Sequence, residues 1–97
     1  MDIRIEVSFK FEESLYPADI LILKLSAYPI KFFYVVHIFD DQLVSQFSAR
    51  YILASKECNF MPVKTQTQRE TMLIQSMQSA IMNHKYHPCL YNKSIAV

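Results

Sequence analysis

Glycine is absent from this sequence of 97 residues. Loops that cradle nucleotide phosphates need glycine, because the backbone must approach the phosphate closely. The strand-to-helix turn that presents the nucleophile of serine hydrolases needs glycine as well. The composition therefore excludes these common nucleotide and hydrolase sites. It also predicts turns built from Asp, Asn, Ser and Pro.

Net charge, cysteine and long apolar runs are also scarce. Lys and Arg number 10 and Asp and Glu 9, so the formal charge of +1 gives no field to attract nucleic acid or an anionic membrane. The cysteines, Cys58 and Cys89, are too few for the disulfide framework of a secreted domain. The longest apolar stretches, 20–25 and 30–39, are too short for a membrane span. Charges at positions 2, 4 and 6 are unlike a signal peptide. We therefore expect a cytoplasmic protein with no nucleic-acid or membrane partner.

The remaining composition fits one domain over residues 1–97, because 52% hydrophobic residues are enough to build a core. Residues 3–11 alternate between apolar and polar side chains, which predicts a half-buried strand. Residues 17–28 predict a helix, in which Pro17 suits the first position and Asp19 the first turn. Pro29 should end this helix.

The second half of the chain predicts a hairpin and another helix. Residues 30–39 are rich in aromatic and β-branched types and predict a strand. A turn at 40–42 and a return strand at about 43–53 complete the hairpin, and 54–66 are irregular. Thr67 and Glu70 match a capping box at the start of a helix that should end before Pro88. Residues 89–97 are either a short last strand or a loose end.

The predicted element order is β-α-β-β-α(-β), an α+β fold. Its simplest packing is a small antiparallel sheet with the first strand beside the third and two helices on one face. This is a ferredoxin-like fold, complete or truncated by its last strand. A winged-helix-like arrangement is the alternative.

Residues suited to metal binding or catalysis are few and poorly spaced. His84, His87 and Cys89 are metal-ligand types, with Cys58 upstream, but no Cys-x-x-Cys pair exists. We interpret them as a polar helix end and expect neither a metal nor another cofactor. Nothing near His87 and Cys89 orients them for nucleophilic catalysis, so we expect no enzymatic activity.

The predicted strand at 30–39 is apolar on both faces. One face carries Phe32, Tyr34, Val36 and Ile38. Helices on one side of a sheet cover only one face, so the face with charged Lys31 should point outward. Exposed apolar side chains of this kind mark partner-binding surfaces. We predict a partner-binding site formed by Lys31, Phe33, Val35, His37 and Phe39.

Residues 7–21 read VSFKFEESLYPADIL, and KLSAY at 24–28 precedes the aromatic strand. This stretch resembles the D component of His-Xaa-Ser peptide-modification systems (HxsD). In that family a strand, a Leu-Tyr turn and a helix ending in Ala-Tyr follow one another. Leu15-Tyr16 and Ala27-Tyr28 are the matching positions.

The resemblance implies a non-catalytic accessory subunit of a ribosomal peptide-modification system. Such a subunit binds radical S-adenosylmethionine (radical SAM) enzymes, or the precursor peptide that they modify, and holds no iron–sulfur cluster. Two distant cysteines agree with this, because they cannot supply the usual ligands of a cluster. The alternative hypothesis is a small phage- or plasmid-type inhibitor that binds a host protein through the exposed strand.

Overall fold

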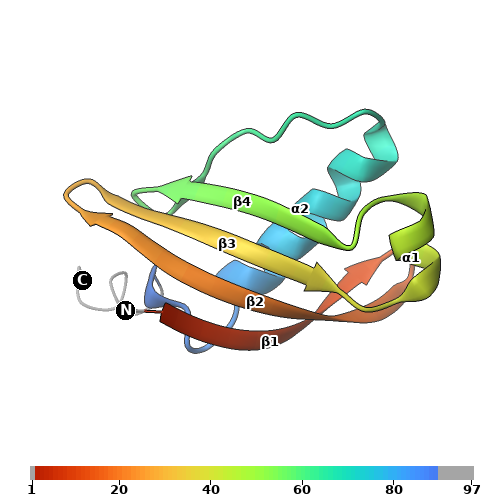
Figure 1. Ribbon diagram of the computed structural model, residues 1–97, viewed down its shortest axis with the longest axis horizontal. Helices are drawn as coiled ribbons and strands as arrows, with labels where there is room; N and C mark the ends of the chain where they lie inside the picture. The colour runs from red at the N-terminus through yellow and green to blue at the C-terminus, as the bar shows by residue number, and fades with distance from the viewer. Residues whose placement is uncertain (1, 90–97) are drawn as a thin grey trace.

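The computed structural model describes residues 2–89, which form an antiparallel sheet with one helix across its inner face (Figure 1). The strands are β1 (Asp2–Phe11), β2 (Ser14–Ala27), β3 (Ile30–Ile38), β4 (Arg50–Lys56) and β5 (Asn59–Phe60). The short helix α1 (Asp41–Gln46) connects β3 to β4, and α2 (Gln68–Met82) follows β5. Each strand pairs with the next one in the chain, so the sheet is a meander.

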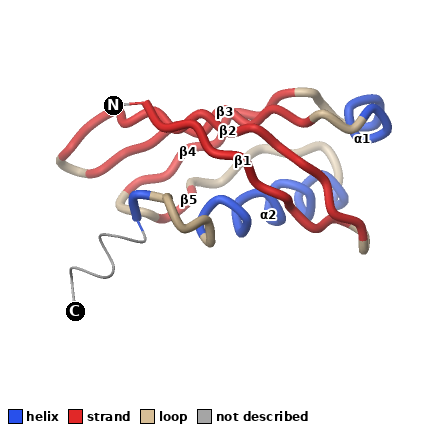
Figure 2. Tube along the Cα trace, turned by 90° about the horizontal axis from the view of Figure 1, so that it is seen from below, coloured by secondary structure: helices blue, strands red, loops and turns tan. Residues whose placement is uncertain are grey.

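The predicted α+β class with an antiparallel sheet is confirmed, but the predicted arrangement is wrong. The first strand does not lie beside the third, because β2 lies between β1 and β3. The two helices also do not share a face: α2 lies under the sheet, whereas α1 lies at its end (Figure 2). This meander order is neither ferredoxin-like nor winged-helix-like.

The helix predicted for residues 17–28 is also wrong, because this segment lies within strand β2 and its turn. Ile20 and Ile22 are buried while Leu21 and Leu23 point to the other face, which is the two-residue period of a strand. Pro17 is tolerated because it lies beyond the last residue pair that joins β2 to β3. Pairing on both sides overrides the local helix signals.

The other predicted elements have mixed outcomes. The strands at 3–11 and 30–39 are confirmed as β1 and β3. The return strand begins only at β4, because Asp40 accepts a hydrogen bond from the Leu43 N–H (3.0 Å) and caps α1. Thr67 caps α2 as predicted, but the Glu70 carboxylate bonds the Gln66 N–H (3.0 Å) instead of that of Thr67. The proposed last strand falls almost wholly outside the described residues.

The core lies between the inner face of the sheet and α2. Helix α2 contributes its buried stripe, and β1, β2 and β3 contribute alternate residues. A buried hydrogen-bonded chain adds the segment after α2 to this core. The Cys89 N–H donates to His87 Nδ1 (3.1 Å), so Nε2 carries a proton and donates to the Tyr34 hydroxyl (3.0 Å). Tyr34 in turn donates to Ser55 Oγ (2.8 Å), and burial raises the pKa of Tyr34.

The cysteines are joined in a disulfide bond between Cys58 and Cys89, across 31 positions of sequence. The bond connects the turn between β4 and β5 to the buried segment after α2, close to His87. The sequence alone did not suggest this pair. Closing a loop of this length stabilises a fold by about 3–4 kcal/mol, chiefly by restricting the unfolded chain.

Two tight turns show how the chain folds without glycine. Glu12 and Glu13 connect β1 to β2, and Glu57 and Cys58 connect β4 to β5, with φ between 49° and 68° at all four residues. Two-residue hairpin loops favour such left-handed pairs, which glycine usually supplies. Arg69 of α2 holds the first turn through a bidentate ion pair with Glu12 (2.6 and 3.1 Å). Its hydrogen bond lowers the pKa of the Glu12 carboxyl.

We predict that Glu13→Gly stabilises the protein by about 0.5–1 kcal/mol, because Glu13 occupies the left-handed region at φ 68° and glycine does so without strain. Urea unfolding followed by circular dichroism measures the change. The control Ser14→Gly lies next in the chain but inside β2, where glycine should be destabilising. Equal effects of the two substitutions would contradict the turn geometry.

Candidate protein-binding face

The two faces of the sheet differ in what covers them. Helix α2 packs across the inner face, whereas no helix of the described chain lies over the other face (Figure 2). We call this second surface, formed by the outward side chains of β1 to β4, the open face. It points toward the viewer in Figure 1.

The predicted residues of β3 lie on the open face. Lys31, Phe33 and His37 are exposed and Val35 is half-buried, while the side chains between them are buried. Phe39, just after β3, is 53% exposed, and Phe33 is 39% exposed. The predicted orientation of the two faces of this strand is therefore confirmed.

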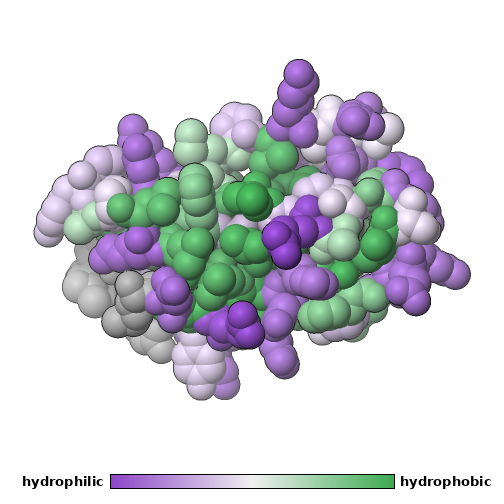
Figure 3. All heavy atoms as spheres, viewed as in Figure 1, coloured by the Kyte–Doolittle hydropathy of each residue, from purple (hydrophilic) through white to green (hydrophobic). Residues whose placement is uncertain are grey.

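Strand register extends this surface over three strands. Val35 lies between Leu21 of β2 and Ile52 of β4, and Phe33 lies beside Leu23. Ile52 is 62% exposed. The apolar patch is defined as Leu21, Leu23, Phe33, Val35 and Ile52, and it appears as the green area at the centre of Figure 3.

Polar side chains border the apolar patch at both ends. The polar row is defined as one line of register across four strands: Glu6, Asp19, His37 and Arg50. Lys31 and Lys56 are neighbours at the opposite end. Phe39 lies beyond the polar row and stacks on His37, with 4.9 Å between ring centroids. Of the five predicted residues, Phe33 and Val35 thus belong to the patch, and the other three lie around it.

Sequence reasoning missed Leu21 and Leu23 as patch residues, because both were assigned to a helix. The signal for them was present, because residues 20–23 are apolar at every position, as residues 32–36 of the next strand are. Two adjacent strands that are apolar on both faces predict a face that one helix layer cannot cover.

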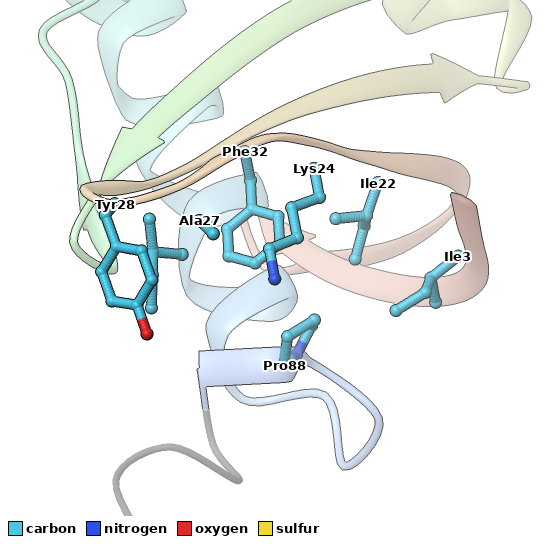
Figure 4. A pocket seen from close by; sticks show the side chains of 8 residues that line it. Ile3, Ile22, Lys24, Ala27, Tyr28, Phe32 and Pro88 are labelled. Atoms are coloured by element: carbon cyan, nitrogen blue, oxygen red, sulfur yellow. The ribbon is translucent and has the colours of Figure 1, made fainter. Parts of the chain in front are cut away.

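A separate pocket of about 330 Å³ lies on the inner side, beyond the end of α2 (Figure 4). Its walls are mostly apolar and include Ile22, Phe32 and Pro88, with the Lys24 side chain reaching across it. Lys24 is the one charged side chain in this lining. An apolar cavity with one cation offers a binding site and no pair of groups for acid–base chemistry.

The residues that resembled metal ligands serve structural roles. Cys89 is in the disulfide bond, and the His87 ring is buried against Tyr34. His84 accepts a hydrogen bond from the Tyr86 N–H (3.2 Å). Within residues 2–89, no three His, Cys, Asp or Glu side chains come together as a metal site. In the same part of the chain, no helix has the length and hydrophobicity to cross a membrane.

Comparisons with known proteins assign neither a family nor a function to this chain. No family model matches the chain, and no curated protein or solved structure is significantly similar to it. The segment that resembled HxsD forms a β-hairpin here, so the helix that the resemblance implied is not present.

We predict opposite outcomes for charges placed on the two faces of β3. Phe32→Asp buries an unpaired carboxylate at a position that is 4% exposed, which should cost more than about 4 kcal/mol and unfold the domain. Phe33→Asp should change the free energy of unfolding by less than about 1 kcal/mol. Chemical unfolding of the two variants tests this. Similar losses would mean that the open face is covered in the folded monomer.

Proposed function

We propose that this protein is a non-catalytic accessory subunit that binds a protein partner through the apolar patch. The observation that carries the proposal is a sheet face with a contiguous apolar centre and a polar border, over which residues 2–89 place no covering layer. Surfaces with an apolar core and a polar rim are typical of protein interfaces. Burying a fully exposed side chain of this size contributes about 1.5–3 kcal/mol, and each patch residue contributes a part of this, because Phe33 is 39% and Ile52 62% exposed and the others are half-buried.

The resemblance to HxsD supplies the proposed partner. It is a radical SAM enzyme, or the precursor peptide that such an enzyme modifies. The strand, the Leu-Tyr pair and the Ala-Tyr pair support this choice, whereas the β2 strand in place of the family's helix weighs against it. In this role the chain contributes binding surface, and the chemistry belongs to the enzyme.

The alternative function, an inhibitor of a host protein, finds support in a different feature. Strand β3 is internal, so it cannot add a strand of a partner. Strand β1 offers an edge instead, because it is the terminal strand of the sheet and pairs only with β2 among the described strands. An extended peptide can pair with such an edge through backbone hydrogen bonds.

The proposed partner can be tested by co-purification with the enzymes and peptide encoded beside the gene. We expect a stable complex with one of them, and Phe33→Asp should weaken it at least tenfold, about 1.4 kcal/mol. Leu15→Asp is the matched control, because Leu15 is an exposed residue of β2 outside the apolar patch, 70% exposed. A well-folded wild-type protein that binds none of these neighbours would refute the proposed partner.

The proposed role places the protein in the cytoplasm, where thiols are kept reduced. The Cys58–Cys89 bond makes this location testable. We predict that both cysteines react with an alkylating agent when cells are quenched and denatured in acid, and that the bond forms after purification. Mass spectrometry counts the alkylated thiols. A fully oxidised pair in quenched cells would contradict the cytoplasmic location.

A further inference from the structure

We infer that, in the free protein, the open face is covered by the open face of a second copy of this chain, in a twofold-symmetric dimer. The inference rests on the proposed function, because it takes the open face to be the partner-binding face. It adds that a second copy competes with the partner for this face. It is carried by the polar row, in which the acidic residues lie on one side of the sheet and the basic ones on the other.

The order of charges in the polar row is self-complementary. Glu6 and Asp19 lie on β1 and β2, and His37 and Arg50 follow on β3 and β4. A twofold axis parallel to the strands, between β2 and β3, places β1 of one copy over β4 of the other. Glu6 then faces Arg50 of the second copy, and Asp19 faces its His37. Each contact occurs twice, as symmetry requires.

Glu6 and Arg50 lie too far apart to pair within one copy, whereas Asp19 and His37 are neighbours in the register of β2 and β3. Neighbouring strands are about 4.8 Å apart, so Glu6 and Arg50 are separated by about 14 Å across the sheet. Within residues 2–89 the structure contains one salt bridge, which joins Arg69 to Glu12 on another part of the surface. The charges of the polar row are thus free to meet a complementary row.

Four of the five residues of the apolar patch fit the same symmetry. The axis places Leu21 over Val35 of the second copy and Leu23 over its Phe33, whereas Ile52 lies over Arg4 of the second copy. The strands of the two sheets run nearly in line, which is the common way in which two sheets pack face to face. The net charge of +1 per chain gives little repulsion between copies.

A twofold axis perpendicular to the strands is disfavoured by the same charges. Centred on the Arg4–Ile52 line of register, it would set Arg4 against Arg4 of the second copy. It would also set Glu6 against Asp2 of that copy. Like charges in contact cost free energy, so the charge pattern disfavours this position of the perpendicular axis.

The dimer should be reversible. Four strands about 4.8 Å apart and six residues rising about 3.4 Å each give a face of about 400 Å² in projection. Two such faces give about 800 Å² in projection, less than a standard protein interface, so we expect a weak dimer with a dissociation constant in the micromolar range or above. A partner with better contacts can then displace the second copy.

The test is sedimentation equilibrium from about 1 µM to about 1 mM, a range that spans such affinities. We expect a monomer–dimer equilibrium for the wild type. Glu6→Arg and Arg50→Glu should each raise the dimer dissociation constant at least about tenfold, because each creates two like-charge contacts. The combined variant restores both pairs and should dimerise like the wild type. Lys10→Glu, which alters charge on the open face outside the polar row, should have no effect.

Each outcome separates this inference from the proposed function. A wild type that stays monomeric at the highest concentration overturns the dimer, whatever it binds. Dimerisation without rescue in the combined variant overturns the proposed axis. Dimerisation with rescue supports the inference even if no neighbouring enzyme or peptide binds, in which case the proposed partner alone fails.

Discussion

One helix cannot cover both faces of a five-stranded sheet, and much of this protein depends on that limit. Helix α2 covers the inner face with a single buried stripe. Strands β2 and β3, however, carry apolar side chains on both faces, and the second set remains at the surface. Contact between these apolar side chains and water is unfavourable. Burying them against another molecule therefore lowers the free energy and favours association. The proposed binding face follows from the lack of a second covering layer among residues 2–89.

The absence of glycine shapes how the sheet is connected. Both I′-like turns use residues with side chains at positive φ, and each such residue costs of order 1–2 kcal/mol. Compensating contacts lie close to these turns. Arg69 bonds Glu12 and lies over the ring of Phe47, 5.2 Å from its centroid, while Cys58 is held by the disulfide bond. Each strained turn is therefore tied to another part of the fold.

Local patterns in the sequence predicted the elements whose structure depends on local interactions. Alternation identified β1, and the Thr67 cap identified the start of α2. Strand β2 was missed because Pro17 and Asp19 imitate a helix start, and only its pairing with strands on both sides reveals the sheet. Strand order could not be predicted either, since meander and ferredoxin-like orders use similar strands and differ only in long-range contacts.

The binding face was predictable in part for the same reason. The β3 residues were identified because apolar types at consecutive positions exceed what one face can bury. Their neighbours Leu21 and Ile52, and the polar row, depend on strand register, which no local pattern encodes. The charge pattern in particular joins positions as distant as Glu6 and Arg50. It becomes visible only when the strands are placed side by side.

The proposed self-association and the proposed partner binding use one face, so the two would be energetically coupled. A partner must release the second copy before it binds, so its apparent affinity falls as the concentration of this chain rises. Substitutions in the apolar patch weaken both complexes, because both bury the same side chains. Substitutions in the polar row affect the two complexes differently, because only a second copy of this chain carries the complementary row. The difference between the two binding free energies therefore decides which complex forms.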